Sequence, residues 1–100
     1  MDKIEAISKL KKYKKLLSKK MVFDQMILFG SYAKDNADEN SDVDVAIVVE
    51  EISGDYFSTR PLLWKTRRAV DDRIEPVLIV KSKDDSGFFK EIIRHGIIID

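Results

Sequence analysis

Two aspartates, two positions apart, open an apolar segment near the middle of the chain. Asp42 and Asp44 alternate with valines, and the apolar run continues through Val49. This alternation predicts a β-strand, on which residues two apart project from the same face. The two carboxylates would then converge. Because like charges repel, such a pair is stable when a hard cation neutralises it, when solvent screens it, or when one carboxylate takes up a proton. A metal site and a solvated strand start are therefore both open interpretations.

A Gly-Ser pair, separated from Asp42 by ten residues, supplies a second candidate site. Gly30 ends the apolar run 26–29, and we expect a short helix over 31–37. A strand-to-helix turn presents free backbone N–H groups to anions, and Gly lets phosphate oxygens come close. The Ser31 hydroxyl can donate to a phosphate or cap the helix. Alone, the pair fits an ordinary capped turn, but beside two carboxylates it describes a place for a metal–triphosphate complex.

Together, the two motifs resemble the nucleotidyltransferase superfamily related to DNA polymerase β, and most closely its short members, the minimal nucleotidyltransferases. The matching stretches are Leu28-Phe29-Gly30-Ser31-Tyr32-Ala33-Lys34 and Ser41-Asp42-Val43-Asp44-Val45. The family's third carboxylate, on a later strand, matches Glu75 within Arg73-Ile74-Glu75-Pro76-Val77.

The resemblance implies a Mg²⁺-dependent transferase in which Asp42, Asp44 and Glu75 are the catalytic and metal-binding residues. Two Mg²⁺ ions are implied, one bridging the triphosphate and one lowering the pKa of the attacking hydroxyl. Glu75 would act as base or as a ligand of the second ion. An edge-strand salt bridge of Glu75 with Arg73 or with a neighbouring lysine is the alternative interpretation.

The same resemblance assigns Gly30, Ser31 and Lys34 to binding of ATP or another nucleoside triphosphate. Family members commonly have Gly after the basic residue of this turn, whereas this chain has Asp35. The negative charge of Asp35 would lower the affinity for triphosphate unless Lys34 offsets it.

Hydrophobic periodicity predicts one α/β domain over residues 1–100, with a small mixed sheet and helices mainly on one face. We expect helices over 4–17, 31–37, 61–70 and 88–95. We expect strands over 26–29, 43–49 and 74–80, and a short terminal strand over 97–99. A loop is expected over 53–55. The second long helix should begin near Pro61, and Gly96 should be a left-handed cap. Trp64, Phe88 and Phe89 are expected in the core. The resemblance implies the polymerase β-like palm fold.

Composition narrows the possible ligands and locations. Cysteine is absent, so a metal must be held by oxygen atoms or by the single His95, which favours a hard cation. We expect His95 at a helix end, where a cationic side chain is favourable. No apolar run is long enough to cross a bilayer, and the first residues lack a signal-peptide pattern. We therefore predict a cytoplasmic protein without membrane contact.

Charge is distributed unevenly along the chain. Residues 1–20 carry eight Lys and two acidic residues, a net charge of +6, whereas the remainder carries −6. A Lys-rich helix face is usually only solvated, so we do not expect direct nucleic-acid binding.

The predicted catalytic core fills most of the chain and leaves little surface to recognise an acceptor. Short members of the resembled family are paired with a helical HEPN-type protein in toxin–antitoxin-like units. This implies transfer of a nucleoside monophosphate, AMP, to a hydroxyl of such a partner. A non-catalytic antitoxin module that masks its partner and an aminoglycoside-type small-molecule transferase are the alternatives. A homo-oligomer is also open.

Overall fold

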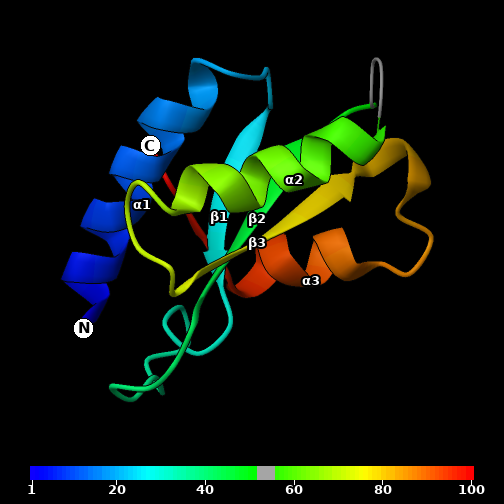
Figure 1. Ribbon diagram of the computed structural model, residues 1–100. Coiled ribbons are helices and arrows are strands. Elements are labelled where there is room, and N and C mark those ends of the chain that lie inside the picture. The colour runs from blue at the N-terminus through cyan, green and yellow to red at the C-terminus, as the bar shows by residue number, and fades with distance from the viewer. Residues whose placement is uncertain (52–55) are drawn as a thin grey trace.

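The computed structural model describes residues 1–51 and 56–100, with helices on both faces of a four-stranded sheet (Figure 1). The elements, in chain order, are α1 (Lys3–Ser18), β1 (Gln25–Phe29), β2 (Val43–Val49), α2 (Tyr56–Arg67), β3 (Ile74–Val80), a 3₁₀ turn η1 (Lys81–Lys83), α3 (Phe88–His95) and β4 (Ile97–Ile98). The loop predicted over 53–55 lies outside the described residues. Within the described residues, no helix is both long and apolar enough to traverse a bilayer.

The sheet has the order β3-β2-β1-β4 and contains both strand directions. β1 pairs antiparallel with β2 and with β4, whereas β2 and β3 are parallel. Every side chain of β2 except Asp44 is buried, which explains its nearly continuous apolar sequence. β3 lies at an edge of the sheet, a position that tolerates Pro76, which has no N–H to donate to a ladder.

Two helices cover one face of the sheet and the third covers the other. On the first face, α1 and α2 bury side chains against those of all three long strands: Leu10, Tyr13, Leu17, Leu63, Met26, Leu28, Val45, Ile47 and Ile74. On the second face, α3 contributes Ile92 to a smaller cluster with Ile27, Ala46, Val48 and Ile79. The prediction of a small mixed sheet with helices mainly on one face is confirmed.

The segment after β1 is a turn, and the helix predicted over 31–37 does not form. The N–H of Lys34 donates to the carbonyl of Gly30 at 3.1 Å, which closes one helical turn. Asp35 then adopts a φ of 59°, a left-handed conformation that ends a helix. The backbone N–H groups near Gly30 therefore belong to a turn and lack the dipole of a regular helix.

The second long helix begins earlier than predicted. α2 starts at Tyr56, so Pro61 lies inside the helix, where its missing N–H removes one backbone hydrogen bond. Tertiary contacts outweigh that loss: Leu63 is buried, and its carbonyl accepts a hydrogen bond from the Tyr13 hydroxyl at 2.8 Å.

Two aromatic residues predicted in the core are substantially exposed, Trp64 by 39% and Phe88 by 42%. One face of Trp64 is covered by the guanidinium of Arg67, 4.4 Å from the ring centroid, rather than by the core. The left-handed cap predicted at Gly96 is also wrong, since its φ is −87°. Glycine is required there for a different reason, because a Cβ would lie 2.5 Å from a methyl group of Ile27.

Candidate active site

The strand register brings carboxylates from two strands to the same end of the sheet. Asp44 on β2 pairs with Phe29 of β1 on one side and with Glu75 of β3 on the other. Asp42 lies just before β2, two residues from Asp44 and therefore on the same face. Parallel pairing of β2 with β3 thus places Glu75 beside both aspartates.

Gly30 directly follows Phe29 and lies against the carboxylate of Asp44. Its φ is +75°, a conformation that side chains other than hydrogen disfavour. A Cβ built on Gly30 would lie 2.4 Å from Oδ2 of Asp44. Glycine at this position therefore lets the Gly-Ser turn and the carboxylate approach each other closely enough to share one ligand.

Burial, and after it the repulsion among the three carboxylates, raises the pKa values of Asp44 and Glu75. Burial raises the pKa of Asp44, and the charge of Asp42 raises it further. Burial also raises the pKa of Glu75. The charge of Asp42, a hydrogen bond with Asp42 and the charge of Asp44 raise it further, in that order, whereas the charge of Arg67 lowers it. In the described part of the chain, none of the three forms an ion pair. Among the described side chains, Arg67 offsets this negative charge only in part.

Comparison with known proteins assigns the chain to a family. The family model described as "Polymerase beta, Nucleotidyltransferase" matches residues 11–99. The chain belongs to this nucleotidyltransferase family. A protein of Methanocaldococcus jannaschii, named as a putative protein adenylyltransferase, is 35% identical over 98 residues, which cover 94% of this chain and 98% of that protein.

The fold agrees with a solved structure as well. The crystal structure of a putative nucleotidyltransferase from Sulfolobus solfataricus matches with a TM-score of 0.69, covering 96% of this chain and 80% of that one, at 14% identity. The resemblance recognised from the Gly-Ser and Asp-Val-Asp motifs is confirmed, and the chain is an enzyme that uses a nucleoside triphosphate as substrate.

Two arginines that sequence reasoning missed brace the strand starts of this nucleotidyltransferase. The guanidinium of Arg73 donates to the carbonyls of Glu39 and Ser41, the second at 3.0 Å, and Ser41 directly precedes Asp42. Arg67 donates to the carbonyl of Ile74 at 3.0 Å, directly before Glu75. The alternative of a salt bridge from Arg73 or a lysine to Glu75 is wrong, because no ion pair among the described residues involves Glu75 and Arg73 donates to backbone carbonyls instead.

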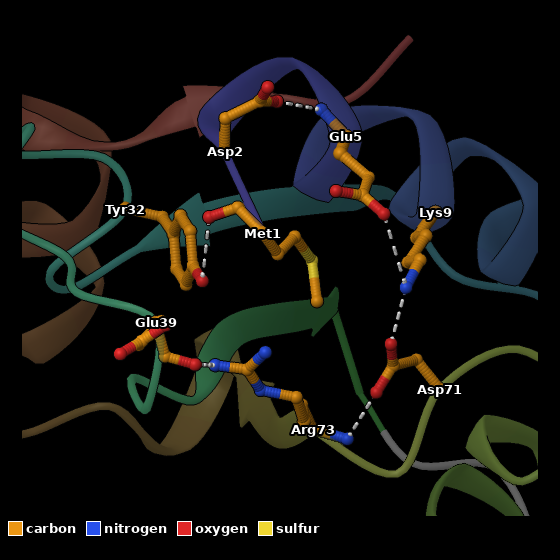
Figure 2. A network of polar contacts seen from close by, with 8 residues as sticks. All are labelled: Met1, Asp2, Glu5, Lys9, Tyr32, Glu39, Asp71 and Arg73. Atoms are coloured by element: carbon orange, nitrogen blue, oxygen red, sulfur yellow. Dashed lines mark hydrogen bonds and ion pairs between the residues drawn. The ribbon is translucent and has the colours of Figure 1, made fainter.

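A polar network extends from Arg73 to α1 (Figure 2). The carboxylate of Asp71 accepts from the backbone N–H of Arg73 at 2.8 Å and from Nζ of Lys9 at 2.5 Å. Lys9 also lies 3.7 Å from the carboxylate of Glu5. Burial alone would raise the pKa of Asp71, but the hydrogen bonds from Lys9 and Arg73 and their charges hold it below its usual value. The network joins the first helix to the turn that leads into β3.

The remaining predicted residues lie next to Gly30. Ser31 follows it and is partly exposed, while Lys34 is exposed and lines a small cavity together with Gly30. Asp35 has a positive φ of 59°, a conformation that favours glycine, and its carboxylate pairs with Nζ of Lys3 at 3.0 Å. Within residues 1–51 and 56–100, no group of three or more His, Cys, Asp or Glu already has the arrangement of a complete metal site.

Proposed function

We propose that this nucleotidyltransferase moves AMP from Mg²⁺-bound ATP to a hydroxyl group of a partner protein. The observation that carries the proposal is the contact of Gly30 with the Asp44 carboxylate, beside Asp42 and Glu75. This contact joins a turn suited to phosphate with a concentration of negative charge suited to a cation.

The carboxylates fit a magnesium ion. Asp42 and Asp44 share one face. Burial, and then the charge of Asp42, raises the pKa of Asp44, and a divalent cation would relieve this repulsion. Mg²⁺ is usually held by one or two carboxylates together with substrate phosphates and water. A site completed by the triphosphate needs no full set of protein ligands, and a second ion would be held by Glu75 with one of the aspartates. When bound, Mg²⁺ neutralises phosphate charge and favours ionisation of the attacking hydroxyl.

The chain's own groups would orient the reactants. Backbone N–H groups of the 30–31 turn and the Ser31 hydroxyl are donors for phosphate oxygens, and Lys34 supplies a positive charge at the same turn. The acceptor oxygen would attack the α-phosphorus, the bond from that phosphorus to the bridging oxygen would break, and pyrophosphate would leave. Glu75 would act either as the base that takes the proton of the acceptor hydroxyl or as a ligand of the second ion.

Asp35 is compatible with this chemistry. Its carboxylate is paired with Lys3 on α1 and is 73% exposed, so solvent and Lys3 both reduce its repulsion of a triphosphate. The substitution for glycine therefore does not exclude activity.

A protein acceptor is favoured by the name of the relative, a putative protein adenylyltransferase, and by exposed apolar side chains. Ile4 is 81% exposed, Ile93 42% and Ile98 51%. A standard interface covers about 800 Å² of each partner, roughly an eighth of the 6241 Å² surface of this chain. We propose a helical HEPN-type protein in a toxin–antitoxin-like pair as that partner.

The test is transfer of label from α-³²P-ATP with Mg²⁺ to the product of the adjacent gene. Wild type should label that protein, and Asp42→Asn and Asp44→Asn should not. Asp85→Asn, an exposed change of the same type outside the site, is the control and should retain transfer. A partner that binds tightly but is never labelled would contradict the proposal and favour the masking alternative.

A further inference from the structure

A small cavity opens beside Gly30 on the α3 face of the sheet. Its lining comes from Phe29, Gly30 and Lys34 and from Phe88 and Ile92 of α3, and its volume is about 120 Å³. We propose that this cavity holds the base of the nucleoside triphosphate, adenine when ATP is the donor. The inference rests on the function proposed above, because it assumes that the triphosphate binds at the 30–31 turn.

The position of the cavity is continuous with the proposed phosphate site. Gly30 belongs to both, since it lines the cavity and also lies against the carboxylate of Asp44. Phe29, which lines the cavity too, is the register partner of Asp44 on the neighbouring strand. A nucleotide with its phosphates between the turn and the carboxylates therefore has its nucleoside next to the cavity mouth.

The walls suit a flat aromatic ring. Ile92 is 3% exposed and provides an apolar floor. The rings of Phe29 and Phe88 meet edge to face, 5.8 Å apart at 89°. Because Phe88 is 42% exposed, part of its ring is free to stack on a base. A cavity of about 150 Å³ accommodates one benzene ring, so a purine would insert one edge and leave the rest at the open rim.

The rim carries polar groups that can read the base. Oε1 of Glu91 lies 3.4 Å from Nε2 of His95, one helical turn away, and both residues line the cavity. An ionised carboxylate only accepts hydrogen bonds. At the position where adenine carries its exocyclic amino donor, a thymine-like base such as uracil carries a carbonyl oxygen. A Glu91 carboxylate that faces this position of the base would favour ATP over UTP.

Calorimetric titration of Mg²⁺ complexes of ATP, UTP and tripolyphosphate separates the base from the phosphates. Phe88→Ala should weaken binding of ATP about tenfold, within the range for loss of one stacking ring, and leave binding of tripolyphosphate unchanged. Ile93→Ala is the matched control, because Ile93 is also on α3 and 42% exposed but does not line the cavity. It should change neither affinity. Glu91→Gln should reduce the preference for ATP over UTP.

A second measurement needs no variant. In the wild type with Mg²⁺ and ATP, nuclear Overhauser contacts should join the adenine ring protons to the ring protons of Phe88. Absence of these contacts, or equal ATP affinity in Phe88→Ala and wild type, would overturn the base assignment while leaving phosphate binding in place. Failure of both ATP and tripolyphosphate to bind the wild type would overturn the proposed function, and this inference with it.

Discussion

Replacing Gly30 by alanine tests the central contact of the site. Left-handed backbone costs a residue with a Cβ about 1–2 kcal/mol, and φ at Gly30 is +75°. The new Cβ would lie 2.4 Å from Oδ2 of Asp44, so the carboxylate must rotate away. A displaced side chain costs about 0.5–1.5 kcal/mol, while the lower entropy of an unfolded alanine returns about 0.4–1 kcal/mol.

The sum is a loss of about 2 kcal/mol in the free energy of unfolding, or about 8–16 °C in Tm for a chain of this size. Urea and thermal unfolding of Gly30→Ala measure it. Transfer of labelled AMP should also be lost, because the Asp44 carboxylate no longer occupies its position beside the turn.

A double-mutant cycle isolates the clash. In an Asp44→Ala background the carboxylate is gone, so Gly30→Ala should cost only the backbone contribution, about 1 kcal/mol. If Gly30→Ala costs the same in both backgrounds, the close approach of Gly30 to the Asp44 carboxylate is not what requires glycine. Wild-type stability of Gly30→Ala would refute the backbone argument as well.

Four further changes probe the electrostatics and the turn. Without divalent cations, Asp44→Asn should be more stable than wild type at pH 7, because the raised pKa of Asp44 means that its ionisation opposes folding. Because the raised pKa makes the native state of the wild type bind more protons than its unfolded state, the wild type gains stability as the pH falls. In urea titrations the stability difference between Asp44→Asn and wild type should therefore shrink as the pH falls through the raised folded pKa toward the unfolded value of about 4. Asp71→Asn should cost about 1–3 kcal/mol at pH 7 by loss of charge-assisted hydrogen bonds. Because the folded pKa of Asp71 is lowered, its contribution is present above about pH 4 and should vanish as the pH falls through the folded pKa, so equal pH dependence in both proteins would contradict the network. Arg73→Lys keeps the positive charge but loses the planar guanidinium that donates to the carbonyls before Asp42. Because Asp42 would be positioned less well, kcat should fall about tenfold, with little change in Kd for Mg²⁺ and ATP. Asp35→Gly should raise stability by up to about 1 kcal/mol in thermal unfolding, because φ is 59° there.

Much of the sheet and part of the site could be predicted from local patterns. The period of two placed Asp42 and Asp44 on one face, and the apolar run before Gly30 marked the end of β1. Glu75 was reached only through the family resemblance. A single carboxylate at a strand start has no periodic signal, and its position beside Asp44 depends on the parallel pairing of two strands distant in sequence.

The features that sequence reasoning missed depend on long-range or backbone contacts. Arg73 donates to carbonyls 32 and 34 residues away, and a backbone acceptor has no residue type to recognise. The helix expected over 31–37 failed at Asp35, whose left-handed conformation is rare outside glycine and is visible only as a departure from the family pattern. Pro61 was interpreted by its usual preference for a helix start, which the burial of Leu63 overrides.

The short strand β4 has a consequence for aggregation. Ile97 and Ile98 pair with Leu28 and Ile27 on the outer side of β1, and the N–H of Ile99 donates to the carbonyl of Met26 at 2.8 Å. β1 is almost entirely apolar, and an uncovered apolar edge strand is a template for pairing with another chain. Until residues 97–99 dock, β1 would be such an uncovered edge strand. A nascent or proteolysed chain that lacks residues 97–99 should therefore self-associate through β1. Pairing with β4 covers this edge of β1 and so prevents misassembly once residues 97–99 have been synthesised.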